Sequence, residues 1–150
     1  MKKSIGPKTI LYPHPVLLVG TYDGAGTPNL MTVSWGGICC SQPPCVAVSL
    51  RKATYSYGNI SARKAFTVGV PSETHLKPTD YCGTYSGREG DKFSAAGFTP
   101  VRSEVVDAPF AAECLLVLEC RLVHTFELGL HTQFVGEIVD VKVDEEAMTE

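Results

Sequence analysis

The chain has 150 residues, of which 44% are hydrophobic and 19% are charged, and its formal net charge is -3. This length and composition predict a single globular domain over residues 1–150, with enough apolar side chains for a core. The absence of a basic stripe argues against a nucleic-acid partner. The apolar runs are too short to cross a bilayer, and the start MKKSIGPKTILYPHP has no apolar signal core. We therefore expect a cytoplasmic protein with no membrane partner.

Six cysteines are present, but none forms a C-x-x-C motif or a Cys/His group with zinc-finger spacing. Cys39 and Cys40 are neighbours, and Cys114 and Cys120 fall on one predicted strand, about 20 Å apart at roughly 3.3 Å per residue. We expect most of these cysteines to be small buried apolar residues in a reducing compartment, and we predict no metal site.

In chain order, the alternation of apolar residues predicts strands over residues 15–23, 30–38, 45–50 and 66–70. The turn residues of GAGTPN connect the first two strands as a hairpin. In the second strand Met31, Val33 and Trp35 are expected on one face, opposite Thr32 and Ser34. A short helix is predicted over residues 56–65, with Ser56 as its N-cap.

The second half of the chain begins with an irregular region and ends with two long strands. Pro78 suits the first turn of a helix, and Asp91 is expected to cap a helix that stops at Gly97. Strands are predicted over 113–129 and 134–146, with a bulge near Ile138 and Val139, where the alternation slips. At least six strands joined by short helices predict a closed or nearly closed antiparallel barrel.

Cations and hydroxyl groups are concentrated where the third strand ends and the helix begins. Arg51 and Lys52 supply charges, while Thr54 and Ser56 supply hydroxyl donors next to the positive end of a helix. These groups fit a phosphate better than a carboxylate, because three acceptor oxygens can each find a donor. The alternative is a solvated strand edge that the two cations keep soluble.

Two other stretches are candidates for ligand contacts. NLMTVSWGG places Thr32 and Ser34 next to a glycine pair that a flat heteroaromatic ring can approach closely, although both side chains could instead face solvent. DYCGTYSGREGDKF (80–93) has the composition of a binding loop, or of an ordinary surface connection. Cys82 in this loop would be reactive only if a nearby cation lowered its pKa. We find no catalytic acid–base pair, and hence an enzymatic activity would depend on a cofactor.

Taken in order, these stretches resemble the flavin reductase-like family of FMN-binding split barrels, and its flavoredoxin branch in particular. The N-x-M-T-V-S-W strand, the double-proline turn and the S-L-R-x-x-T element occur in the family's order and spacing. The similarity covers most of residues 13–98. It implies a mainly β, six-stranded antiparallel split barrel of Greek-key type that forms a homodimer, with FMN near the subunit interface.

The resemblance also implies a set of site residues. His14 would lie at the rim, where a nicotinamide could stack. Related chains usually continue past the last strand with a tail near the cofactor, whereas this sequence stops at DEEAMTE, and so no flavin contact from such a tail is predicted. The residues implied to line the isoalloxazine are Asn29, Met31, Thr32, Val33, Ser34 and Trp35; those implied to hold the ribityl-phosphate are Ser49, Leu50, Arg51 and Thr54, with Lys52 or Tyr57 nearby; those of the second loop are Cys82, Ser86 and Lys92.

Three functions remain compatible with the sequence. The first is an FMN-dependent oxidoreductase that takes electrons from NAD(P)H or from a redox protein. The second is a non-catalytic electron carrier with permanently bound FMN, and the third is a barrel that binds another ligand such as haem. The sequence identifies neither the electron donor nor the acceptor.

Overall fold

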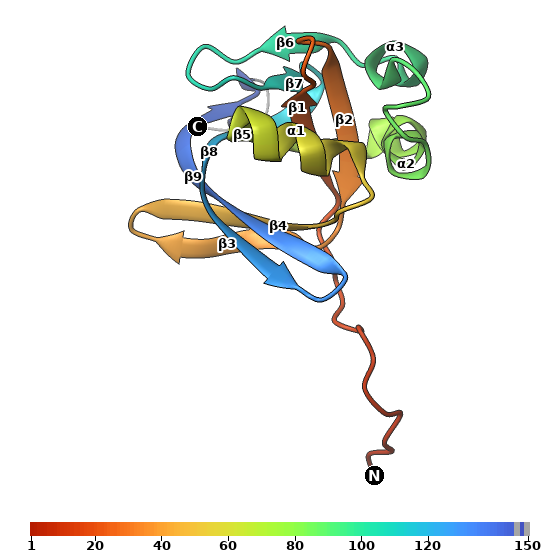
Figure 1. Ribbon diagram of the computed structural model, residues 1–150. Coiled ribbons are helices and arrows are strands. Elements are labelled where there is room, and N and C mark those ends of the chain that lie inside the picture. Colours follow the sequence, from red (N-terminus) through yellow and green to blue (C-terminus); the bar gives the residue numbers. More distant parts are fainter. Residues whose placement is uncertain (146–147, 149–150) are drawn as a thin grey trace.

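In the computed structural model, which describes residues 1–145 and 148, the main sheet curls so that the end of one edge strand comes next to the start of the other (Figure 1). Within these residues the sheet has seven antiparallel strands in the order β2-β1-β5-β8-β9-β4-β3. The strands are β1 (Leu17–Tyr22), β2 (Pro28–Val33), β3 (Gly36–Ser41), β4 (Pro44–Arg51), β5 (Ala65–Pro71), β8 (Cys114–Leu128) and β9 (His131–Val143).

The two edge strands, β2 and β3, are separated in sequence only by Ser34 and Trp35. A flat sheet would hold its edges some 28 Å apart, given strand spacings of about 4.7 Å, and two residues cannot bridge that span. The sheet must therefore close into a barrel. The Ser49 amide fixes the corner by donating a hydrogen bond to the Trp35 carbonyl at 2.9 Å.

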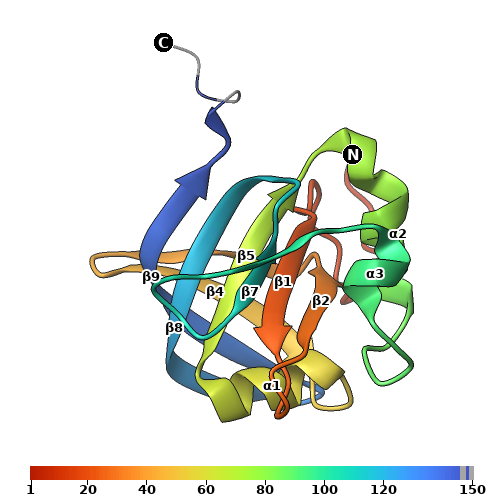
Figure 2. The ribbon, with the colours of Figure 1, turned by 90° about the horizontal axis from the view of Figure 1, so that it is seen from above.

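Short helices and a second small sheet cover the outside of the barrel. Helix α1 (Tyr55–Arg63) lies against β1, while α2 (Leu76–Thr84) and α3 (Lys92–Ala96) lie beside β2 (Figure 2). A 3-10 turn, η1 (Glu73–His75), precedes α2. Strands β6 (Pro100–Arg102) and β7 (Pro109–Ala111) pair with each other, and β7 packs over β1 and β5. The mainly β split barrel expected from the sequence is confirmed.

Both faces of the central strands are buried, which explains the apolar run in β1. Val19 points into the barrel, where it packs in a cluster with Phe66 and Phe134. Its neighbour Leu18 points outward into a second cluster, which contains Phe93 of α3. The barrel is therefore filled by side chains, and any ligand has to bind at its ends or corners.

Most predicted strands are confirmed, with shifts of one to three residues at their ends; the largest shift is in the last strand, which was predicted over 134–146 and spans His131–Val143. The continuous strand predicted over 30–38 is wrong, because the chain turns at Ser34 and Trp35 to change sheet edges. This division explains why the main sheet has seven strands and not six. The predicted bulge is confirmed: Ile138 pairs with Cys120 and Asp140 pairs with Glu119, so that Val139 has no partner across the ladder. Residue 146, the last of the predicted final strand, lies outside the described residues.

One predicted helix cap is wrong, and the other helix predictions are confirmed. Ser56 is not the N-cap of α1, because the extended residue before the helix is Thr54. The Ser56 hydroxyl instead accepts a hydrogen bond from Asn29 Nδ2 at 3.0 Å. Pro78 lies in the first turn of α2, and Asp91 caps α3, whose last turn ends at Gly97 with φ +73°. These three predictions are confirmed.

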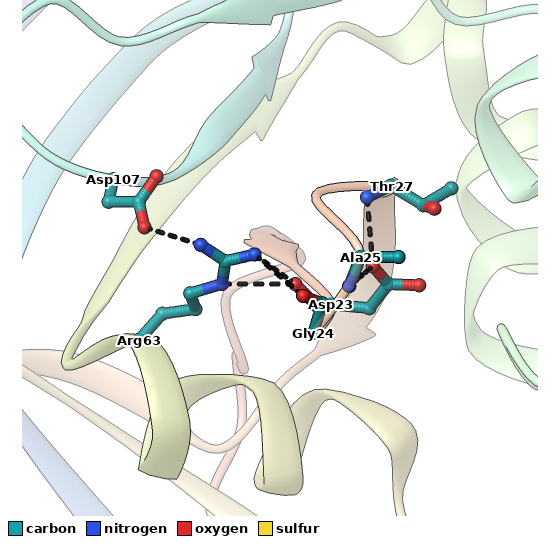
Figure 3. Close-up of polar contacts among 6 residues, drawn as sticks. All are labelled: Asp23, Gly24, Ala25, Thr27, Arg63 and Asp107. Atoms are coloured by element: carbon teal, nitrogen blue, oxygen red, sulfur yellow. Dashed lines mark hydrogen bonds and ion pairs between the residues drawn. The ribbon is translucent and has the colours of Figure 1, made fainter.

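A polar network ties the far end of α1 to the β1–β2 turn (Figure 3). The Asp23 carboxylate accepts hydrogen bonds from the amides of Ala25 and Thr27, each at 2.8 Å, and these bonds lower the Asp23 pKa. Arg63 donates from Nε to the Asp23 carbonyl at 3.0 Å and forms an ion pair with Asp107 at 3.0 Å. The network fixes the helix axis and thereby the position of its N-terminus.

Close packing inside the barrel gives a stability prediction. A Cβ atom at Gly136 would lie 2.6 Å from Phe66 Cζ and 2.8 Å from Cys120 Cβ. Gly136→Ala should therefore lower the free energy of unfolding by about 1–3 kcal/mol, the usual cost of overpacking a core. Urea denaturation measures the change.

Gly37→Ala is the matched control, because no described atom lies within 4 Å of a Cβ built there. It should be neutral or add up to about 1 kcal/mol of stability. Equal stabilities of the two variants would contradict the packing described for the barrel interior.

Candidate functional site

The junction between β4 and α1 presents unpaired positive charge. Thr54 donates to the Arg51 carbonyl through both its amide, at 3.0 Å, and its hydroxyl, at 2.9 Å, which fixes the turn into the helix. The first turn of α1 contains no acidic residue, and no described side chain caps it. Its free N–H groups and the positive end of the helix dipole therefore favour a bound anion.

The two cations of this junction have different surroundings. Lys52 forms an exposed ion pair with Glu127, which lowers the pKa of that carboxylate. Within the described part of the chain, the Arg51 guanidinium has no ion-pair partner. Lys52 therefore behaves as expected for a cation that keeps a strand edge soluble, whereas the Arg51 guanidinium remains available to a ligand.

A hollow of about 290 Å³, which we call the α1 hollow, opens at this junction. One wall comes from the end of β4 and the start of α1, and the other from α2 and the loop that follows it. Its lining residues are Asn29, Met31, Arg51, Ala53, Thr54, Tyr55, Ser56, Cys82, Gly83, Thr84, Tyr85, Ser86, Gly87 and Lys92.

A second hollow of about 180 Å³, the Trp35 hollow, lies at the corner where the chain changes sheet edges. Met31, Arg51 and Thr54 line both hollows, which makes them adjoining parts of one site. The lining residues of the Trp35 hollow are Met31, Thr32, Val33, Ser34, Trp35, Ser49, Leu50, Arg51, Thr54 and His131.

Asn29 provides a buried acceptor to the α1 hollow. Its side chain is 3% exposed, and its Nδ2 is used by Ser56, whereas its Oδ1 has no hydrogen-bond partner among the described residues. Leaving a buried polar atom unpaired costs about 1–3 kcal/mol. A Cβ at Gly87 would lie 2.2 Å from this oxygen, so only glycine lets the loop approach Asn29 here. This acceptor is suited to a donor group on a bound ligand.

Lys92 and Cys82 form the floor of the α1 hollow. Lys92 is 5% exposed and donates to the Cys82 carbonyl at 2.6 Å. Burial lowers the pKa of Lys92, and it raises the pKa of Cys82 to about 11 despite the opposing effect of the lysine. The Cys82 thiol is therefore protonated near neutral pH, and a reactive thiolate at this position is disfavoured.

The sequence-predicted residues mostly gather at these two hollows. Of the fifteen residues implied to contact the cofactor or lie near it, all but Lys52 and Tyr57 line them. Lys52 is paired with Glu127, and the Tyr57 ring packs edge-on against Phe134 in the core, with centroids 5.4 Å apart. His14 lies on the other side of the corner, in a separate hollow that it shares with Lys8, Ser34 and Trp35.

His131 is a site residue that the sequence analysis missed. Its ring lies 4.7 Å from the Trp35 ring, and across the ladder it faces Arg51. His131 reaches the site because β9 pairs with the strand that contains Arg51. The alternation of apolar residues does not reveal which strands pair, and so the sequence alone could not place His131 here. Tyr55, Thr84 and Gly87 were also missed, because they belong to loop and helix ends with no periodic pattern.

A closed antiparallel sheet with adjoining hollows at its corner defines a ligand-binding split barrel. A family model described as "Flavin reductase like domain" matches residues 9–150. The chain belongs to the flavin reductase-like family. Among the described residues, no helix is long and apolar enough to cross a membrane.

Solved structures and curated proteins agree with this family. The chain is 53% identical to the flavoredoxin of Desulfovibrio vulgaris (Miyazaki F), with a TM-score of 0.95 over 100% of this chain and 80% of that one. It is 35% identical to the flavoredoxin from Methanosarcina acetivorans, with a TM-score of 0.93 over 99% of this chain and 78% of that one. An uncharacterized protein of Archaeoglobus fulgidus is 36% identical over 131 residues, 87% of this chain and 73% of that protein.

The buried Lys92 gives a pH prediction. Its pKa is lower in the folded protein than in the unfolded chain, and so between those two values the unfolded chain binds more protons. Stability therefore rises with pH in that window as the buried charge is lost. Relative to Lys92→Met, the wild type should gain stability as the pH rises toward 10.5, the ordinary pKa of a lysine, measured by urea denaturation under reducing conditions. A stability difference that stays constant with pH would contradict the lowered pKa.

Proposed function

We propose that this protein binds FMN, with its phosphate in the α1 hollow and its ring in the Trp35 hollow, and works as an oxidoreductase of the flavin reductase or flavoredoxin type. The observation that carries the proposal is the unpaired Arg51 beside the uncapped first turn of α1, at the wall shared by the two hollows. The family and the 53% identity to a flavoredoxin support the same cofactor.

The donor set of the α1 hollow matches a phosphate group. Free N–H groups at the start of α1, the Arg51 guanidinium and the hydroxyl of Ser86 can each donate to a different oxygen. The unpartnered Asn29 Oδ1 can accept from a ribityl hydroxyl. The residues present therefore fit the polar half of FMN.

The Trp35 hollow suits the flat half of the cofactor. Trp35, His131 and Met31 offer apolar and aromatic surface. Strand β2 is an edge of the sheet, so some of its N–H and C=O groups lack a ladder partner and can bond to the polar edge of a ring. The Thr32 hydroxyl is not available for this, because it donates to the Thr79 carbonyl.

Bound FMN would supply electron transfer between a donor and an acceptor, which requires no acid–base pair from the protein. The chain's own task is to hold the ring in one orientation and to shield part of it from water. Donors aimed at the ring's polar edge would stabilise the negative charge that reduction adds. His14 is our candidate for the rim where a nicotinamide stacks, because its hollow meets the site at Ser34 and Trp35.

We propose NAD(P)H or a redox protein as the electron donor. Stopped-flow mixing of the FMN-loaded protein with NADH and then with NADPH tests whether NAD(P)H is the donor. Bleaching of the yellow flavin absorbance within seconds would establish an NAD(P)H-dependent enzyme. Bleaching by dithionite alone would favour an electron carrier served by proteins, and a colourless protein that takes up no FMN would overturn the proposed cofactor.

We also propose a homodimer. Exposed apolar side chains gather on the β8–β9 hairpin, where Leu128 and Leu130 are 58% and 65% exposed, close to the Trp35 corner. Association of two barrels through this surface would cover it and narrow the opening of the Trp35 hollow. Light scattering of the FMN-loaded protein at micromolar concentration should give twice the 16.1 kDa chain mass. A strict monomer that retains FMN would contradict this arrangement.

Arg51→Ala tests the phosphate assignment. A hydrogen bond to a charged group is worth about 1.5–3 kcal/mol, and therefore FMN affinity should fall about ten- to one-hundred-fold. Riboflavin has the same ring without the phosphate, and its affinity should scarcely change. Titration by quenching of flavin fluorescence measures both.

Lys52→Ala is the matched control, since it removes the neighbouring cation whose charge is already paired with Glu127. It should leave the affinities for FMN and riboflavin unchanged. Equal losses for both flavins in Arg51→Ala would mean that the arginine supports the fold and contacts no phosphate.

A further inference from the structure

Three thiols meet at the β3–β4 hairpin, which projects from the barrel (Figure 1). Cys40 of edge strand β3 and Cys45 of β4 are direct partners across the antiparallel ladder. The register shifts between Ile38 and Cys40, which makes Cys39 a bulged residue. Cys39 and Cys40 are exposed, whereas Cys45 is 5% exposed. All six cysteines lie in the described part of the chain and are free thiols.

Direct partners across antiparallel strands have the spacing that a disulfide requires. Their Cα atoms are about 4.5–5.5 Å apart, within the roughly 4.4–6.8 Å found across disulfides. The Cys45 thiol is also in contact with its neighbours: burial raises its pKa, and the thiols of Cys40 and Cys39 raise it further. The register of Cys40 and Cys45 is therefore compatible with the Cα spacing of a disulfide.

We propose that Cys40 and Cys45 form a reversible cross-strand disulfide, which makes the β3–β4 hairpin a thiol–disulfide exchange site for small disulfides such as oxidised glutathione. Oxidation of this pair is independent of the flavin. Arg51 lies six positions after Cys45 along β4, about 20 Å at roughly 3.3 Å per residue. Ser49, the nearest residue of β4 that lines the site, lies four positions after Cys45, about 13 Å, which is too far for direct contact with a ligand there.

The exposure of the two thiols sets the order of steps. The exposed Cys40 thiolate attacks one sulfur of oxidised glutathione, which forms a mixed disulfide and releases one glutathione thiolate. The Cys45 thiol then loses its proton to that thiolate or to water and attacks the Cys40 sulfur, releasing the second glutathione. Overall the protein loses two S–H hydrogens and gains one S–S bond, while one glutathione disulfide becomes two thiols.

Two competing roles for these thiols are less well supported. A metal site is not supported, because no group of three or more His, Cys, Asp or Glu residues in the described chain could hold a metal ion, and that includes the three cysteines of this hairpin. A purely structural crosslink would stabilise less here than across a long loop, because the closed loop contains only the four residues 41–44 and loop-closure entropy grows with loop length. A labile, exchangeable bond is the use that fits an exposed hairpin.

The test is incubation of the folded, FMN-loaded protein with a glutathione redox buffer, followed by acid trapping and intact-mass measurement. Wild type and Cys39→Ser should both lose the mass of two hydrogen atoms as the buffer becomes more oxidising, and dithiothreitol should reverse the change. Cys45→Ala should instead trap one glutathione on Cys40. Cys40→Ser should show neither the two-hydrogen loss nor that adduct at Cys40.

The serine variants at the exposed positions 39 and 40 separate the possibilities even if the buried Cys45→Ala fails to fold. Retention of the two-hydrogen loss in Cys40→Ser would overturn the proposed pair. Disappearance of the two-hydrogen loss in Cys39→Ser would also overturn the proposed pair, because the bond would then involve the bulged Cys39 thiol. Circular dichroism and flavin absorbance of each variant establish that the fold and the cofactor are unchanged.

Discussion

The position of the site follows from the short passage between the two edges of the sheet. Because only Ser34 and Trp35 connect β2 to β3, the sheet closes at this point, and the ends of β2 and β4 are brought together. The closed interior is filled by side chains such as Phe66 and Phe134. The interior therefore has no room for a ligand, and the two hollows proposed as the site lie around the closure.

A second constraint is the electrostatic balance of the α1 hollow. Anion-binding groups are placed at its mouth, where Arg51 and the start of α1 keep their charge and their free N–H groups. The two residues of its floor are buried, and this burial raises the pKa of Cys82 and lowers that of Lys92. Positive charge at the mouth would suit the phosphate that we propose there, and the potentially nucleophilic thiol beside it is kept neutral.

Patterns of alternation and capping were enough to predict the barrel, the Val139 bulge and the cap at Asp91, because each is a local consequence of side-chain type. The break at Ser34 was not predictable in this way, since Met31, Val33 and Trp35 keep one alternation into the turn, and Gly36 and Gly37 have no side chains to mark the start of a new strand. Ser56 was misassigned as a cap because its hydroxyl bonds to Asn29, a residue distant in sequence. His131 and Tyr57 show the same limit: tertiary packing decides which of them reaches the site.

The central claim is that FMN occupies the two adjoining hollows, and a crystal structure of the FMN complex tests it most directly. The account predicts phosphate oxygens within hydrogen-bonding distance of the first-turn amides of α1 and of the Arg51 guanidinium, with the isoalloxazine ring extending past Met31 to Trp35. Density for the flavin in the hollow beside His14, or a phosphate pointing into solvent away from α1, would contradict it.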